Sequence, residues 1–206
     1  MLNKFFNFSE FQLIHLEKFY HLHIDAQLNL TAIKGREEFY YKHILDSVYF
    51  LRFLDIDFET AIDLGSGGGF PGVILAIYFP DKKFYLVESI SKKCAFLQEA
   101  IFILGLQNVC VINERCETIK NLKVDLIFSR GVGKVKDILQ WTKNVSHETT
   151  GYVLYKGEQL DAEVKDAYSV LKKRGMEANH VRVEEPIKRS YLYINSSYFW
   201  RVRPKA

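Results

Sequence analysis

The chain has 206 residues, 48% of them hydrophobic, which is enough to bury one substantial core without a metal or disulfide staple. Its 28 basic and 25 acidic residues leave a net charge of +3, too small an excess to specify a charged partner. The three cysteines show no paired or metal-ligand spacing, which argues against a disulfide scaffold and leaves us expecting no metal site.

The first fifty-odd residues predict helices and no strands. Ser9 and Gln12 have the spacing of a capping box at the start of a helix over 9–26, and a second helix is expected over 36–54. Between them, "NLTAI" (29–33) is expected to be a loop. Polar residues interrupt the first twenty positions and no apolar run is long enough to span a membrane, so we expect no signal peptide and no membrane partner. The odd number of unpaired cysteines suits a reducing compartment, so we expect a cytoplasmic protein. We expect residues 1–57 to form a helical extension packed on a single compact domain over 58–206.

From residue 60 short apolar runs alternate with helix-length segments. The runs "TAIDLG", "KFYLVES", "NVCVINE", "VDLIFSRG" and "GYVLYKG" predict five strands of a parallel sheet with right-handed crossovers. The last two runs, "HVRVEEP" and "SYLYINS", are joined by too few residues for a helix, so they should pair antiparallel. The expected fold is α/β and Rossmann-like, with a mainly parallel seven-stranded sheet and an antiparallel last strand.

The stretch "DLGSGGGFPG" (63–72) forms a glycine turn between the first of these strands and a helix. This is the usual crevice for a nucleotide-like ligand. Gly67, Gly69 and Gly72 fit a dinucleotide pattern, whereas Asp63, Gly65, Gly67 and Gly69 fit an S-adenosylmethionine pattern. A carboxylate would repel a pyrophosphate but attract an ammonium or sulfonium, so Asp63 favours S-adenosylmethionine. A tight turn alone would not require five glycines.

Three further positions fit an adenosine ligand. Glu88 ends the second strand, where a carboxylate can accept bonds from ribose hydroxyls. Cys116 and Glu117 follow the third strand and suit the adenine ring nitrogen and amine. Phe70 either packs within the turn or flanks the cofactor.

A set of motifs in fixed order resembles one family. "NLTAI", "HILDS", "DLGSGGGFPGVILAI", "LVES" with "KKCAFL", "LQNV", "RCE", "SRG" and "YKG" are similar to those of the small-subunit ribosomal RNA methyltransferase G family, also called glucose-inhibited division protein B. The resemblance implies methyl transfer from S-adenosylmethionine to N7 of a guanosine in the 530 loop of bacterial 16S rRNA. It implies cofactor contacts at Gly65, Phe70, Cys116, Glu117 and Arg130. The positions that depart from the family pattern are Gly68, Cys116 and Gly131, where alanine is more usual.

The residues after the fourth strand independently suit a ring nitrogen. Enzymes that methylate exocyclic amines often carry an Asp/Asn-Pro-Pro-aromatic loop there, but this chain reads "SRGVGK". Guanine N7 already exposes a lone pair, so alignment is needed rather than a general base. Arg130 is the leading catalytic candidate, as the residue that orients guanine O6, a phosphate or the cofactor carboxylate.

The expected partner is 16S rRNA or the small ribosomal subunit, bound by a monomer. Contacts with RNA are expected from basic residues around the same edge, some of them in the acid-free C-terminal segment: Lys92, Lys93, Lys156, Arg189, Arg201 and Arg203.

Other interpretations remain open from the sequence. His43, Asp46 and Ser47 resemble a hydrolase triad, but without a nucleophile elbow we expect them to cap or pack the "NLTAI" loop over the cleft. A nicotinamide-dependent oxidoreductase would use the same glycine turn, and a non-catalytic RNA-binding module would keep the fold.

Overall fold

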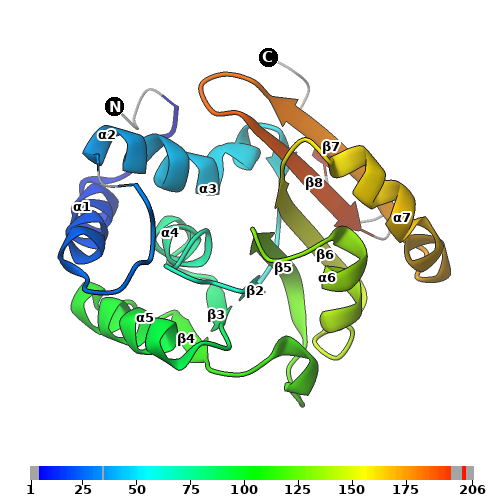
Figure 1. Ribbon diagram of the computed structural model, residues 1–206, viewed down its shortest axis with the longest axis horizontal. Coiled ribbons are helices and arrows are strands. Elements are labelled where there is room, and N and C mark those ends of the chain that lie inside the picture. Colours follow the sequence, from blue (N-terminus) through cyan, green and yellow to red (C-terminus); the bar gives the residue numbers. More distant parts are fainter. Residues whose placement is uncertain (1–4, 34, 196–200, 203–206) are drawn as a thin grey trace.

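The computed structural model describes residues 5–33, 35–195 and 201–202, and its centre is a seven-stranded sheet between two layers of helices (Figure 1). Among these residues no helix is long and apolar enough to span a membrane. In spatial order the strands are β4 (Val109–Ile112), β3 (Lys83–Val87), β2 (Thr60–Leu64), β5 (Val124–Arg130), β6 (Ser146–Lys156), β8 (Arg189–Asn195) and β7 (Glu177–Val183).

The pairing confirms the expected fold class. β2, β3, β4, β5 and β6 are parallel, whereas the final strand β8 runs antiparallel to both of its neighbours, β6 and β7. The connection between β7 and β8 is too short for a crossover helix, which forces the antiparallel pairing. The chain builds outward from β2 to β4 and then returns to β5, so the direction of winding reverses between β2 and β5.

Alternating strand residues fill two separate cores. On one face Ala61 and Phe128 pack with α4 (Gly72–Tyr78), α5 (Ser91–Leu104) and the N-terminal segment. On the other face Ile62 and Ile127 pack with α6 (Val135–Trp141) and α7 (Leu160–Lys173). Successive side chains of a strand point to opposite faces, and here the residues on both faces are apolar, so helices can cover the sheet on both sides.

The N-terminal segment follows the prediction with one correction. Helix α1 (Glu10–Asp25) begins at Ser9 with the expected capping box, and 29–33 is a loop. The second helical segment comprises α2 (Arg36–Phe39), a π-helical stretch η2 (Tyr40–Leu45), α3 (Asp46–Val48) and a 3-10 turn η3 (Tyr49–Arg52). It ends two residues early, because β1 (Leu54–Asp55) pairs with β9 (Arg201–Val202), so the expectation of a strand-free segment was wrong.

Candidate active site

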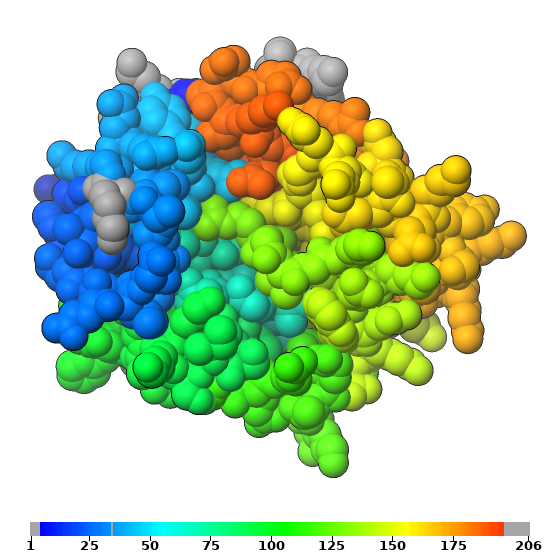
Figure 2. Space-filling model, viewed as in Figure 1, coloured from blue at the N-terminus to red at the C-terminus, as the bar shows by residue number. Residues whose placement is uncertain are grey.

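The predicted site residues come together at the carboxyl edge of the parallel strands. The glycine turn follows β2, Glu88 follows β3, Cys116 follows β4 and Arg130 ends β5. These are four neighbouring strands around the point where the winding reverses, which is where open α/β sheets bind their ligands. In the space-filling view, the teal region around residues 60–75 is visible between the blue N-terminal segment and the later yellow-green elements (Figure 2).

The glycine turn needs its glycines for different reasons. Gly65, Gly67 and Gly69 all have positive φ angles, of 68°, 57° and 91°, which side chains disfavour. A Cβ on Gly65 would lie 2.5 Å from the Val132 side chain, and one on Gly69 would lie 2.7 Å from that of Val73. A Cβ on Gly67 would meet only the Gly65 carbonyl oxygen, at 3.8 Å. Gly67 therefore faces open space through which a ligand can approach the backbone.

Asp63 supports the turn from beneath. Its side chain is fully buried, and Oδ2 accepts a hydrogen bond from the Gly72 N–H at 2.9 Å, at the start of α4. Burial raises its pKa to about 7. Oδ1 is buried without a hydrogen-bond partner among the described residues. A fully buried side chain offers a ligand no direct contact, so what the structure shows for Asp63 is support of the glycine turn.

Glu88 closes the other side of the turn. Its Oε2 accepts from the Gly67 N–H at 3.0 Å and its Oε1 from the Ile90 N–H at 2.9 Å. Each carboxylate oxygen has a second lone pair, so both can still accept from ribose hydroxyls. The Glu88 carboxylate therefore holds the glycine turn and remains chemically suited to the ligand role predicted for it.

Cys116 and Glu117 begin a short 3-10 turn, η4 (Cys116–Thr118). Cys116 is buried, and burial raises the pKa of its thiol to about 12, so it is a neutral packing group and not a nucleophile. Glu117 is exposed, and its backbone carbonyl accepts from the Asn144 side chain at 2.8 Å. Among the described residues no group of three or more His, Cys, Asp or Glu side chains could hold a metal ion.

Phe70 is a packing residue of the turn. Its ring is buried and stacks on His43 with the ring centroids 4.1 Å apart and an angle of 11° between the planes. The Arg130 guanidinium lies over the same ring, 5.2 Å from its centroid. His23 on α1 adds a contact to the neighbouring Gly68 carbonyl, at 2.8 Å. The two N-terminal helical segments therefore contact the glycine turn directly.

The cluster of His43, Asp46 and Ser47 has no triad geometry. Ser47 Oγ donates to the His43 carbonyl, and His43 Nε2 contacts Thr31 Oγ1 in the "NLTAI" loop at 2.7 Å. The predicted packing of this loop is confirmed. The sequence reasoning missed that His43 and Asp46 also contact Arg130, at 3.0 Å in both cases.

Of the cations proposed to contact RNA, Lys92 is exposed and Lys93 is half-buried, and both lie in the first turn of α5 beside the glycine turn. Lys156 was expected to contact RNA from the surface, and the structure contradicts this. It is buried, and its Nζ donates to the Gly133 carbonyl at 2.6 Å and to Glu163 at 2.8 Å. The described part of Arg201 is its backbone in β9, and Arg203 lies outside the described residues.

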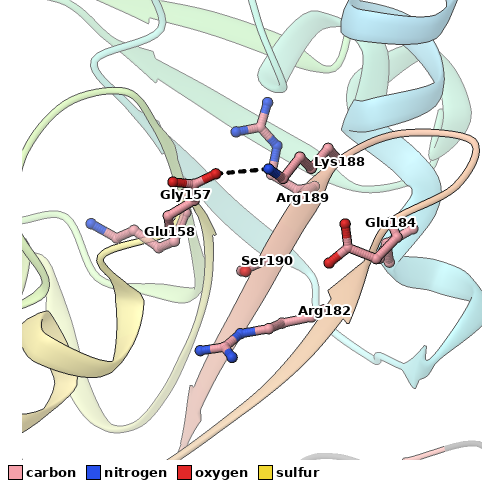
Figure 3. A pocket seen from close by; sticks show the side chains of 9 residues that line it. Gly157, Glu158, Arg182, Glu184, Lys188, Arg189 and Ser190 are labelled. Atoms are coloured by element: carbon pink, nitrogen blue, oxygen red, sulfur yellow. Dashed lines mark hydrogen bonds and ion pairs between the residues drawn. The ribbon is translucent and has the colours of Figure 1, made fainter.

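A cavity of about 480 Å³ lies beside the carboxyl end of β6 (Figure 3). Its lining includes Arg189 and Ser190 from β8, Arg182 from β7 and the exposed ion pair between Lys188 and Glu158. Arg189 reaches from this cavity to Asp46, at 2.9 Å from both Nε and Nη2. Asp46 therefore connects the cavity with Arg130 at the glycine turn.

Comparisons with known proteins point to one family. A family model described as rRNA small subunit methyltransferase G matches residues 12–191. The chain is 38% identical over 172 residues to "Ribosomal RNA small subunit methyltransferase G" of Carboxydothermus hydrogenoformans, covering 80% of this chain and 73% of that protein. The Aliarcobacter butzleri protein of the same name is 37% identical, covering 81% and 80%.

Among solved structures, the chain resembles a SAM dependent methyltransferase from Aquifex aeolicus, with a TM-score of 0.55 and 19% identity. The match covers 76% of this chain and 92% of that one. At this level of identity the likeness concerns the fold.

Proposed function

Because the chain belongs to the rRNA small subunit methyltransferase G family, we propose that it transfers the methyl group of S-adenosylmethionine to N7 of a guanosine in the 530 loop of bacterial 16S rRNA. The observation that carries this proposal is the meeting of Gly67, Glu88 and Arg130 at one edge of the sheet. The family match leaves no support for the nicotinamide-dependent alternative. We propose further that residues 1–57 are an extension of a methyltransferase domain over 58–206.

The residues present fit this cofactor. The open space at Gly67 admits a ligand to the backbone, Glu88 suits ribose hydroxyls, and the unpartnered Asp63 oxygen favours a cation above it. Bound there, S-adenosylmethionine supplies an electrophilic methyl group on a sulfonium. We assign cofactor contacts to Gly65, Gly67, Gly69 and Glu88 around the turn and to the Cys116 backbone, Glu117 and Arg130 beyond it. Phe70 is omitted because its buried ring packs within the turn.

The reaction requires little from the protein beyond alignment of the methyl donor and the guanine. The sulfur–methyl bond breaks as the N7–methyl bond forms, and the positive charge moves from sulfur to the guanine without net creation. Arg130 is the group suited to orient the reactants, since two of its N–H donors have no partner among the described residues. Guanine O6, a phosphate and the cofactor carboxylate are the acceptors that fit them.

We propose that the RNA lies across the edge that carries Lys92, Lys93 and Arg189, with Arg201 and Arg203 as further candidates. Lys156 is omitted from this set because its ammonium is buried and paired internally. We further propose that the protein acts as a monomer in the cytoplasm, where its RNA substrate is made.

The test is transfer of labelled methyl from S-adenosylmethionine to small ribosomal subunits isolated from cells that lack this gene, followed by mapping of the modified base. Label at a guanine N7 in the 530 loop is the expected result. If the protein binds S-adenosylhomocysteine but labels neither naked RNA nor any subunit preparation, the proposed substrate is wrong and the fold assignment stands. Parallel calorimetric titration with NADH, expected to show no binding, tests the oxidoreductase alternative.

A further inference from the structure

The Arg130 guanidinium is held by three acceptors from a single helical segment. Nη1 donates to the Lys42 carbonyl and to Asp46 Oδ2, both at 3.0 Å, and Nη2 lies 3.0 Å from His43 Nδ1. An arginine has five N–H donors. The donors without a partner among the described residues are therefore Nε–H and one N–H of Nη2, which remain for a ligand.

The contact with Arg130 determines the tautomer of His43. Arginine only donates, so His43 Nδ1 must accept, and the single proton of the neutral ring must lie on Nε2. That proton is donated to Thr31 Oγ1, 2.7 Å away, which also accepts from the Ile33 N–H. Burial, and then the Arg130 charge, lower the His43 pKa to about 3, so the ring stays neutral at physiological pH.

Asp46 holds Arg130 from the other direction. Its carboxylate is almost fully buried and also binds Arg189 through both Nε and Nη2, while Oδ1 accepts from the Tyr191 hydroxyl at 3.1 Å. One carboxylate is thus shared by two arginines. A buried charge with four hydrogen-bonding contacts is fixed in position, and it fixes its partners with it.

The local backbone explains why one segment supplies all three acceptors. Lys42 and His43 lie in the π-helical stretch η2, and Asp46 begins the α-helical turn that follows. In a π-helix the backbone bonds span five residues rather than four, which shifts the side chains and carbonyls relative to an α-helix, and such stretches are frequent at functional sites.

We propose that His43 and Asp46 are positioning residues that fix Arg130 with two donors free for the reactants, and that Thr31 holds the His43 ring in place by accepting its Nε2 proton. This inference rests on the proposed methyltransferase function. It makes the N-terminal segment part of the active site, because the acceptors for Arg130 precede it by 84 to 88 residues.

Two variants of His43 separate its acceptor from its ring. His43→Phe keeps the stacking on Phe70 and removes the acceptor, whereas His43→Asn loses the ring but places its Oδ1 where Nδ1 was. Positioning predicts that kcat for methyl transfer falls at least tenfold in His43→Phe and less than threefold in His43→Asn. A role in packing alone predicts the reverse order, and that order would overturn the proposal.

A matched pair at Thr31 provides a second test should His43 variants fail to fold. Thr31→Ser retains the hydroxyl and should keep wild-type kcat, whereas Thr31→Val should lower it severalfold. Equal kcat in the two variants would count against a role for the Thr31 hydroxyl in holding His43. Nuclear magnetic resonance of the imidazole nitrogens at pH 7.5 gives a readout independent of turnover: the His43 proton is expected on Nε2, and a proton on Nδ1 would refute the assignment.

The failure of this inference is distinguishable from failure of the proposed function. If the wild-type protein transfers no methyl to any RNA, the function is wrong and the resonance measurement alone judges the tautomer. If the wild-type protein methylates its RNA and all His43 and Thr31 variants match it, only the positioning role is wrong.

Discussion

Arg130 at the end of β5 and Asp46 in the helical segment over residues 36–52 are joined by a hydrogen-bonded ion pair, with Nη1 3.0 Å from Oδ2. The side chain of Asp46 is 2% exposed and that of Arg130 is 14% exposed. The pair connects the helical segment before the sheet to the strand that carries the proposed catalytic arginine. Both the chemistry and the stability of the molecule should therefore depend on it.

Replacing Arg130 with alanine should lower kcat for methyl transfer by about a hundredfold or more, because misplacing the reactants by an ångström has effects of that size. The fold should survive, since Asp46 keeps its bidentate partner Arg189. Single-turnover transfer of labelled methyl measures the effect. Arg52→Ala, which removes an exposed arginine packed on Tyr49, is the matched control and should be active. Near-wild-type turnover by Arg130→Ala would disprove its role.

Removing the shared Asp46 carboxylate should destabilise the protein more than removing one of its two arginine partners. Asp46→Asn leaves two arginines without their counter-charge and should lower the free energy of unfolding by about 3–5 kcal/mol. Arg189→Gln leaves Asp46 paired with Arg130 and should cost only about 1–2 kcal/mol. Urea denaturation of both variants and of the double variant measures their coupling. Equal losses in the two single variants would show that Asp46 is not shared in solution.

Gly67→Ala should weaken cofactor binding more than it weakens the fold. The alanine must adopt a φ of 57°, at about 1 kcal/mol, and its Cβ meets no close neighbour in the protein. The methyl group would instead occupy the space proposed for the cofactor. Gly105→Ala is the matched control, with a φ of 64° and an open Cβ position at the end of α5. Calorimetry with S-adenosylhomocysteine should show loss only for Gly67→Ala, and equal affinities would place the ligand elsewhere.

The free energy of unfolding should depend on pH in opposite directions through two buried groups, His43 and Asp63. Burial lowers the pKa of His43 to about 3, so its contribution is complete above about pH 6.5 and is lost as the pH falls below that value. Burial raises the pKa of Asp63 to about 7, so its contribution is complete below about pH 4 and is lost as the pH rises through 7.

The variants His43→Phe and Asp63→Asn separate the two effects. Denaturation between pH 4.5 and 8 should show less loss towards acid in His43→Phe and less loss towards alkali in Asp63→Asn. Each effect is at most about 1.4 kcal/mol per pH unit. Curves parallel to the wild type would mean that neither group titrates abnormally.

The double variant Lys92→Gln/Lys93→Gln should weaken RNA binding and flatten its salt dependence. Each lost phosphate contact should reduce the slope of log K against log salt by about 0.7–0.9. Lys143→Gln/Lys173→Gln is the control, because these lysines line a separate cavity beside the starts of β6 and β7, at the opposite edge of the sheet. A slope that changes equally in both double variants would argue against a localised RNA surface.

Local sequence was sufficient for the strands of the seven-stranded sheet, for α1 and for the position of the crevice. Alternating apolar strands, the Ser9 cap and the glycine turn are patterns of near neighbours, and each was found where it was expected. The motif order was equally sufficient for the family. These features depend on backbone periodicity and on φ angles that only glycine adopts readily, and both are properties of short segments.

Only the tertiary structure decided which groups meet. Asp46 contacts Arg130 across 84 residues and Arg189 across 143, and no local periodicity encodes either contact. The same holds for Lys156, whose ammonium is buried because it pairs with Glu163 on α7. It also holds for β1, which pairs with the distant strand β9. A charged side chain finds its partner through packing of whole elements, so the sequence could name Arg130 but not what holds it.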